Sequence, residues 1–353
     1  MTTSNTFSQD DLKTAEAMLK LVEALVIKNG EGRIIGRCVW KINLVFHNGH
    51  LRDVRERAWK VFEHFVSVCP RAELVWIGKG KPKKFDSAAA QKEMTKIQTV
   101  DFDDTSESIM PHLGMLPCIP ADAFMENAQP YFLEMNLKRD TPFVPAFPNE
   151  GASMSVLQIG LPLEWNFNQP DGKRVVWFTQ KAVELLQPFW CTAGWGVSLP
   201  PNGVVSSTGG EQQVLYPFLK RFPGMEALGL IRLGRPHFNK AMYSVNWLNF
   251  VSDPLLDKLG GRAGVNALAA KEPLLRTSDV GNCLMIAAGP GPGLGDTERG
   301  IPLPGYDAAA RLLKPIRVQE IDNNCVAPPP YGSGDEKQWM LASDAYLSRF
   351  DQY

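Results

Sequence analysis

The first half of the chain carries two hydrophobic periods that predict a strand, a helix and a second strand. Over residues 38–46 apolar side chains recur at every second position, which is the period of a strand with one buried face. Residues 51–69 instead carry apolar side chains at steps of three and four, which predicts an amphipathic helix that Pro70 ends. Residues 73–77 form a further apolar run and predict the returning strand.

The same order of elements recurs later in the chain. A strand region over 154–165, a helix over 174–190 and a short strand over 193–199 repeat the first unit, and each returning strand contains a tryptophan, Trp76 or Trp195. We interpret the repetition as an internal duplication of a split βαβ unit. The alternative is a chance similarity between two parts of an α+β chain.

Together these patterns predict an α+β fold with two related lobes of antiparallel or mixed sheet and helices packed on one face. We expect an N-terminal lobe over residues 1–150 that ends in a proline-rich connector, a C-terminal lobe over 151–327 and a tail helix over 328–353. Trp339, Leu347 and Phe350 are expected to dock the tail helix on the body. Further predicted elements are helices over 9–28, 211–222, 253–259, 262–271 and 306–313 and strands over 228–233, 243–251 and 281–288.

The composition is that of a globular chain whose overall charge favours no polyanion. Of 353 residues, 44% are hydrophobic, which is enough for a sizeable core. The 37 Lys and Arg and 38 Asp and Glu give a net charge of −1, so the basic excess typical of nucleic-acid or membrane binding is missing. No apolar run is long enough for a transmembrane helix, and the N-terminus lacks the pattern of a secretory signal. We therefore expect a cytoplasmic protein with no nucleic-acid or membrane partner.

The six cysteines are scattered singly, with no CxxC pair and no tight cluster with histidine. In a chain of this length that pattern is typical of small buried hydrophobic residues in a reducing compartment. We expect them to form neither disulfides nor a metal site.

The densest acidic cluster is the candidate contact with a partner. It consists of Asp101, Asp103, Asp104 and Glu107. The spacing loosely resembles a calcium loop, but the glycine required at the sixth position and the glutamate required at the twelfth are both missing. A solvated loop is the default interpretation, and an acidic patch that steers a basic protein partner is the functional one. We therefore take these four residues as partner-binding candidates and predict no metal there.

No sequence motif of catalysis is present. GxSxG and HExxH are both absent, and His47 and His50, which bracket a polar turn, have no third ligand by sequence. Residues 289–296, Gly-Pro-Gly-Pro-Gly-Leu-Gly-Asp, follow a predicted strand as a phosphate loop does. However, the two prolines remove N–H donors and no Gly-Lys-Ser/Thr follows. We expect a structural turn at 289–296, with no catalytic residues and no cofactor.

The most distinctive segments of the chain lie in its second half. They are residues 193–199, where Trp195 stands between two glycines, residues 243–261, and residues 283–296 followed by Tyr306 and residues 313–317. In order and spacing these segments resemble the type VI immunity family of bacterial toxin-neutralising proteins. The strand–helix–strand unit over 37–77 is similar to the start of such proteins but is less specific.

The resemblance implies a stoichiometric inhibitor that binds the toxic effector of a type VI secretion system and protects the producing cell. It carries no catalytic residue over to this chain, and it implies a contact surface in loops on a rigid scaffold. The missing secretory signal fits a toxin that acts in the cytoplasm. The alternative is a hydrolase that reverses a modification made by the toxin. Such an enzyme needs a polar pocket with perturbed acids, for which only residues 101–107 or the His47/His50 pair offer candidates.

Overall fold

The structure, a computed structural model, describes the parts of the chain that form its central sheet and most of its helices. The described residues are 26–69, 72–76, 83–99, 113–117, 127–137, 140, 154–163, 174–200, 211–227, 240–318 and 336–351. Most of the predicted helix over 9–28, the predicted strand over 228–233 and the acidic cluster at 101–107 lie outside them.

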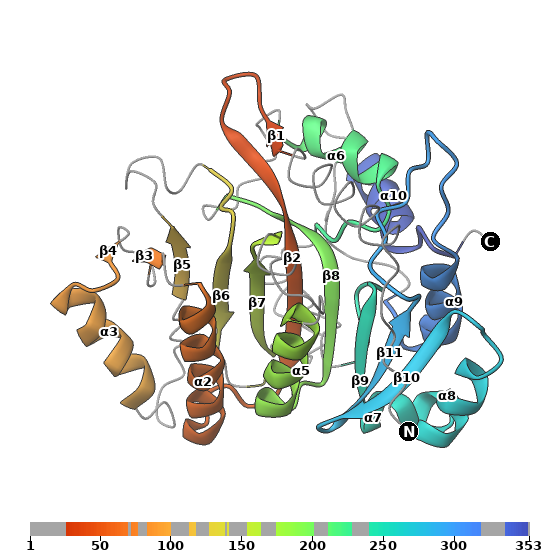
Figure 1. The fold of residues 1–353 in the computed structure, drawn as a ribbon, viewed down its shortest axis with the longest axis horizontal. Helices are drawn as coiled ribbons and strands as arrows, with labels where there is room; N and C mark the ends of the chain where they lie inside the picture. Colours follow the sequence, from red (N-terminus) through yellow and green to blue (C-terminus); the bar gives the residue numbers. More distant parts are fainter. Residues whose placement is uncertain are drawn as a thin grey trace, which may run out of the picture.

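Antiparallel pairing joins the strands of the described residues into one sheet (Figure 1). The strands are β1 Val26–Lys28, β2 Ile34–Phe46, β3 Ala72–Trp76, β4 Lys83–Lys84, β5 Leu113–Pro117, β6 Phe132–Asn136, β7 Ser155–Leu161, β8 Trp190–Ser198, β9 Leu248–Ser252, β10 Leu275–Val280 and β11 Cys283–Ala288. Their order across the sheet is β10-β11-β9-β8-β2-β7-β6-β5-β3-β4, with β1 paired to the start of β2. The long strand β2 therefore lies at the centre.

The α+β class with an antiparallel sheet is confirmed. Strands of both predicted lobes belong to the same sheet, because β7 of the second lobe lies between β2 and β6 of the first. The division of the chain at residue 150 stays a prediction.

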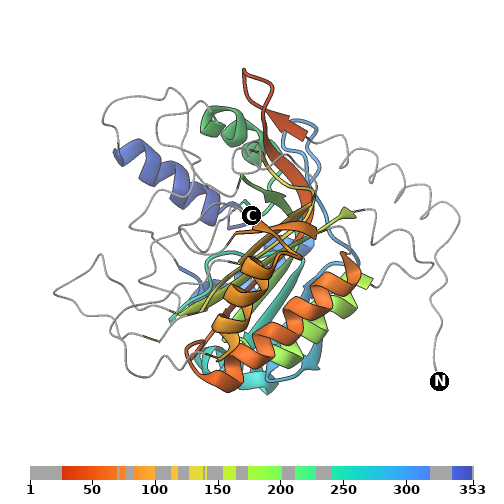
Figure 2. The same cartoon turned by 90° about the vertical axis from the view of Figure 1, so that its left-hand side faces the viewer.

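Helices cover both faces of the sheet. They are α2 Arg52–Val68, α3 Ala88–Thr99, α5 Arg174–Leu186, α6 Glu211–Arg221, α7 Asp253–Leu256, α8 Gly261–Ala269, α9 Pro304–Leu313 and α10 Glu336–Leu347, with short 3-10 turns over Asp257–Leu259 and Lys314–Ile316. Figure 2 shows α2, α3 and α5 on one face and α6 and α10 on the other. The sequence patterns predicted helices on one face of the sheet. In the structure α6 and the tail helix α10 also lie on the second face.

A split βαβ unit is formed by β7, α5 and β8. Both strands pair antiparallel with β2, from its two edges, so they run parallel to each other with β2 between them. The predicted first copy, made of β2, α2 and β3, has the same order of elements. Its two strands, however, are separated by β7, β6 and β5. The split arrangement is therefore present in the second unit, while the first unit spans a wider part of the sheet.

Two predicted helix ends differ from the structure for local reasons. Helix α5 ends before the predicted residue 190 because Gln187 adopts a φ of 48° and Pro188 follows it. Residues 26–28, predicted as the end of a helix, instead pair with β2 as β1. Their sequence, Val-Ile-Lys, begins with two β-branched residues, which favour a strand.

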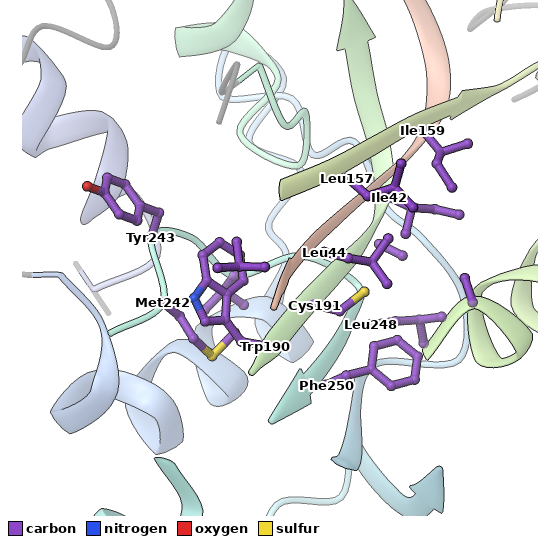
Figure 3. Packing of buried hydrophobic residues seen from close by; sticks show 14 of the residues in the cluster. Ile42, Leu44, Leu157, Ile159, Trp190, Cys191, Met242, Tyr243, Leu248 and Phe250 are labelled. Carbon is purple, nitrogen blue, oxygen red and sulfur yellow. The ribbon is translucent and has the colours of Figure 1, made fainter. Parts of the chain in front are cut away.

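Hydrophobic side chains fill both sides of the central strands (Figure 3). Ile42, Leu44 and Phe250 point toward α5, whereas Trp190 and Met242 lie on the opposite side of the sheet. All five are buried. The sheet is therefore the middle layer of the described structure, and its strands position whatever lies on either face.

A row of polar side chains crosses the sheet on the face opposite α5. Glu134, Gln158, Asn43, Thr192 and Asn249 are in register on five neighbouring strands. The Gln158 amide donates to Asn43 Oδ1 at 2.7 Å, and the Asn43 amide donates to Thr192 Oγ1 at 3.4 Å. Because buried polar groups are costly unless they are paired, these bonds fix the register of the central strands.

Candidate partner-binding cleft

An open cleft of about 380 Å³ lies between α6, α10 and the loop over residues 297–303 that leads into α9. Figures 1 and 2 both place α6 and α10 near each other, on the face of the sheet opposite α5. Leu219 and Lys220 of α6 form one wall, Ala345 and Arg349 belong to the α10 side, and Ile301 lies in the loop. The cleft is therefore assembled from three segments that are far apart in the sequence.

The wall formed by α10 is held in place by a buried tyrosine. The Tyr346 hydroxyl donates to the Met225 carbonyl at 2.9 Å and accepts the Ala227 N–H at 3.0 Å. The intervening residue, Glu226, pairs through its backbone with β8, so the tail helix is fastened to the central sheet. Leu347 and Phe350 are buried, and the predicted docking of the tail helix through them is confirmed.

The loop wall is held by an ion pair. The Arg221 guanidinium donates to both carboxylate oxygens of Asp296, at 3.2 and 2.9 Å, and the Asp296 carboxylate also accepts the N–H groups of Glu298 and Arg299. Two backbone hydrogen bonds between Asp296 and Ile301 close a short hairpin. The loop is therefore fixed before any partner arrives, which lowers the entropy cost of binding.

The hydrogen bonds of this ion pair shift both ionisation equilibria. The bonds from Arg221 lower the pKa of Asp296 below its ordinary value, with a further contribution from the backbone N–H of Arg299. The same contact raises the pKa of Arg221. Both groups are therefore held in their charged forms at neutral pH.

One large apolar side chain that lines the cleft is exposed, and a second is exposed on α10 outside the lining. Ile301, at the end of the hairpin, is 52% exposed, and Leu341 of α10 is 60% exposed. Leu341 lies one helical turn before Ala345, which lines the cleft. Burying such side chains against a partner is favourable, since each loses contact with water.

Some of the charged side chains that line the cleft have an oppositely charged partner and others do not. Neither Lys220 nor Arg349 forms an ion pair within the described residues. The Arg349 guanidinium donates to the carbonyls of Pro223 and Tyr346 and lies over the Tyr346 ring. Asp307, at the start of α9, also lines the cleft but is only 7% exposed, and burial raises its pKa. The accessible walls are therefore positive.

The Gly/Pro segment over 289–296 is anchored to the sheet by tryptophans. The indole N–H of Trp195 donates to the Pro292 carbonyl at 3.3 Å, and that of Trp247 donates to the Gly289 carbonyl at 3.0 Å. The Gly293 N–H donates to the buried hydroxyl of Tyr306. The predicted structural turn is confirmed, and the turn places the hairpin that follows it at the cleft.

The other residues predicted as site candidates either do not lie at the cleft or fall outside the described residues. The four acidic candidates, Asp101, Asp103, Asp104 and Glu107, lie outside the described residues. His47 lies in a turn at the end of β2, where Nδ1 lies 2.7 Å from Asp140 Oδ2. In the described ranges no group of three or more His, Cys, Asp or Glu side chains is placed to hold a metal.

The cysteines that the structure describes, Cys38, Cys69, Cys191 and Cys283, are all buried, as the scattered pattern predicted. Burial raises the pKa of Cys283 to about 12, although Arg262 acts in the opposite direction, and burial also raises the pKa of Cys191. A thiol that stays protonated is a poor nucleophile, so these side chains pack as small apolar groups.

Sequence patterns alone missed the cleft. Its residues come from 216–223, 297–307 and 342–350, and nothing in a single sequence joins these segments. One local indication was present in the tail. Residues 340–342 and 345–347 of α10 carry apolar or aromatic side chains over a wider arc of the helix than docking on one side requires.

Within the described part of the chain, no helix has the length and apolar character that crossing a bilayer requires.

A fixed hairpin, exposed apolar side chains and uncompensated cations around an open cleft are the features of a surface that binds another protein. The sequence profile of one protein family, TsiV, described as type VI immunity for VRR-NUC, matches residues 58–350. The chain therefore belongs to this family of type VI secretion system immunity proteins, and the resemblance found in the sequence is confirmed.

Among solved structures, a bacterial protein has the same fold. The Pseudomonas aeruginosa T6SS protein PA0821 superposes with a TM-score of 0.72 and 22% sequence identity, over 95% of this chain and 90% of that one. At this identity the likeness establishes the fold alone. No curated protein sequence matches the chain.

Proposed function

We propose that the protein is an immunity protein that binds a cognate type VI secretion system toxin and neutralises it by one-to-one protein–protein inhibition. Membership of a family described as type VI immunity for VRR-NUC is the observation that carries the proposal. On the same ground we take the toxin to be a nuclease of the VRR-NUC type. The site of action is the cytoplasm, where such a nuclease meets DNA.

In this proposal the protein inhibits the toxin by remaining bound to it and catalyses no reaction on it. The described residues offer a preformed surface, and the buried thiols and the clamped Asp296 serve packing and loop structure. A stable inhibitory complex typically buries about 1,600 Å² in total, so the cleft forms one part of a larger interface. No cofactor and no catalytic residue takes part.

The acidic cluster remains a proposed contact with this partner. A nuclease presents basic surface to DNA, and an acidic loop attracts that surface over long range. Reversing Asp101, Asp103 and Asp104 to lysine is expected to slow association by about tenfold at low salt and to weaken its dependence on salt. Stopped-flow association rates measure this, and rates equal to the wild type would remove the loop from the interface.

The proposal as a whole is tested by co-expression with the cognate VRR-NUC nuclease toxin. Equimolar production of the protein should restore growth of poisoned cells, and the two chains should purify together in equal amounts. Failure to copurify, combined with continued killing, would contradict the immunity function.

A further inference from the structure

The side chains that line the cleft between α6, α10 and the 297–303 loop favour one kind of partner segment. Two features of the cleft are independent of each other. The first is the exposed apolar side chain of Ile301 in the loop wall. The second is a pair of cations, Lys220 of α6 and Arg349 just after α10, which line the cleft and have no ion-pair partner among the described residues.

We infer that this cleft receives an acidic, apolar segment of the toxin, with a large apolar side chain placed against Ile301 and a neighbouring carboxylate placed between Lys220 and Arg349. The inference rests on the proposed immunity function and adds to it the contact surface and the chemistry of what the surface binds.

The 297–303 loop is held in one conformation before binding, which makes it suitable as an anchor for a partner. Asp296 holds the hairpin through Arg221 and through the N–H groups of the hairpin itself, so Ile301 is presented in one position. A fixed apolar side chain beside a pocket is the arrangement that concentrates binding energy in an interface. About half of the Ile301 side chain remains in contact with water, so the packing of the described core does not explain why an isoleucine stands there.

The cations that line the cleft favour a bound segment of negative charge. Arg221 is already shared between Asp296 and Glu298, which neutralise it. Arg299 lies 3.7 Å from Asp296. Lys220 and Arg349 are the cations that remain, and Arg349 is half-buried, oriented by two carbonyls and the Tyr346 ring. A partner carboxylate gains a partly desolvated ion pair there, whereas a partner lysine meets repulsion.

The buried Asp307 does not reverse this balance. Its side chain makes no hydrogen bond within the described residues, and its burial raises its pKa toward the neutral form, with Arg311 acting in the opposite direction. The exposed carboxylate nearest the hairpin, Glu298, is held by Arg221. The accessible charge of the walls is therefore positive in a chain whose net charge is −1.

The test compares the cleft with a matched surface at another part of the molecule. Ile301→Asp and Lys220→Glu change exposed side chains of the cleft. Leu268→Asp and Lys271→Glu make comparable changes at and just after α8 (Figure 1). Leu268 is also exposed. Affinity and rate constants for the toxin are measured by surface plasmon resonance for each full-length variant, after thermal unfolding shows that each one folds.

We expect Ile301→Asp to weaken binding by about 30-fold, mainly through faster dissociation. Lys220→Glu should slow association by about fivefold, and the loss should disappear at high salt. Both α8 variants should bind as the wild type does. Leu341→Ser changes an exposed side chain of α10 outside the cleft lining, and it tests whether the contact extends along that helix, in which case we expect binding to weaken by about tenfold.

Three outcomes overturn the inference, and they are distinguishable. Wild-type protein that does not bind the toxin overturns both the immunity function and the cleft. Normal binding by all the cleft variants, with a wild type that binds, overturns the cleft alone. Tighter binding of Lys220→Glu shows that the occupant is basic and contradicts the acidic segment.

Discussion

At the scale of single residues, the pair formed by Arg221 and Asp296 connects stability to the shape of the cleft. Asp296 is buried by its neighbours and accepts hydrogen bonds from one side chain and two backbone N–H groups. The ion pair therefore has a structural purpose that a solvated pair lacks. Its loss frees the hairpin that carries Ile301.

The lowered pKa of Asp296 gives this pair a defined pH dependence. A carboxylate whose pKa is lower in the folded protein stabilises the fold above its unfolded pKa of about 3.9, and the contribution is lost as the pH falls through the folded pKa. Asp296→Asn should therefore unfold more easily than the wild type at pH 7. The difference should shrink as the pH falls below about 4.

Urea unfolding between pH 7 and pH 3 measures this difference. Glu184→Gln, which removes an exposed ion pair with Lys181, is the control and should follow the wild type at every pH. A gap between wild type and Asp296→Asn that stays constant down to pH 3 would rule out the ionised Asp296 as its source.

At the scale of elements, the centre of the sheet depends on small residues where polar side chains cross it. Gly194 of β8 is opposite Lys41 of β2, and a Cβ atom at Gly194 would lie 2.1 Å from Asn246 Oδ1. Asn246 in turn forms the bend before β9, where its N–H donates to Asn249 Oδ1. The glycine thus leaves the space in which this polar bend fits.

Gly194→Ala is expected to lower the free energy of unfolding by about 1–3 kcal/mol, because the asparagine must move and leave its hydrogen bonds. Gly291→Ala is the matched control, since no atom lies within 4 Å of the position of its Cβ. Chemical denaturation of both variants provides the comparison. Equal stability of the two would show that the bend adapts to a methyl group without cost.

The same central strands show how far sequence patterns reach. The period of two in β2 correctly predicted the strand and its buried apolar positions at Trp40, Ile42, Leu44 and Phe46. It did not predict that Lys41 and Asn43 are buried as well, because polar positions normally face water. These side chains are buried because hydrogen bonds between neighbouring strands satisfy them and because helices cover the second face.

Edge strands and strand ends were harder to predict. β10, with the sequence Leu-Arg-Thr-Ser-Asp-Val, has buried side chains only at its two ends, and its apolar content gives little strand pattern. β9 begins at Leu248, although the apolar run begins at Tyr243, because Asn249 accepts and donates backbone hydrogen bonds that form the bend. Both features depend on tertiary pairing that no local period contains.

At the scale of the whole molecule, one sheet carries surfaces that serve different purposes. Helices α2 and α5 cover one face of the sheet, and α6 and α10 lie on the other (Figure 2). The second face also carries the polar row, and the cleft lies between α6, α10 and the 297–303 loop. Hydrogen bonds connect the residues beside the cleft to β8, because Trp195 donates to Pro292 and Glu226 pairs with Gly196. The chain belongs to the type VI immunity family, and our proposal assigns this surface to the binding of a toxin.

The most direct test of the immunity function is a titration of the toxin's nuclease activity with this protein. DNA cleavage is followed at a fixed toxin concentration well above the dissociation constant. The account predicts that activity falls linearly and reaches zero at one equivalent of protein. Complete loss of activity at a small fraction of an equivalent would instead show turnover, and would identify the protein as an enzyme that modifies the toxin. Unchanged cleavage at a large excess of protein would contradict inhibition of this nuclease altogether.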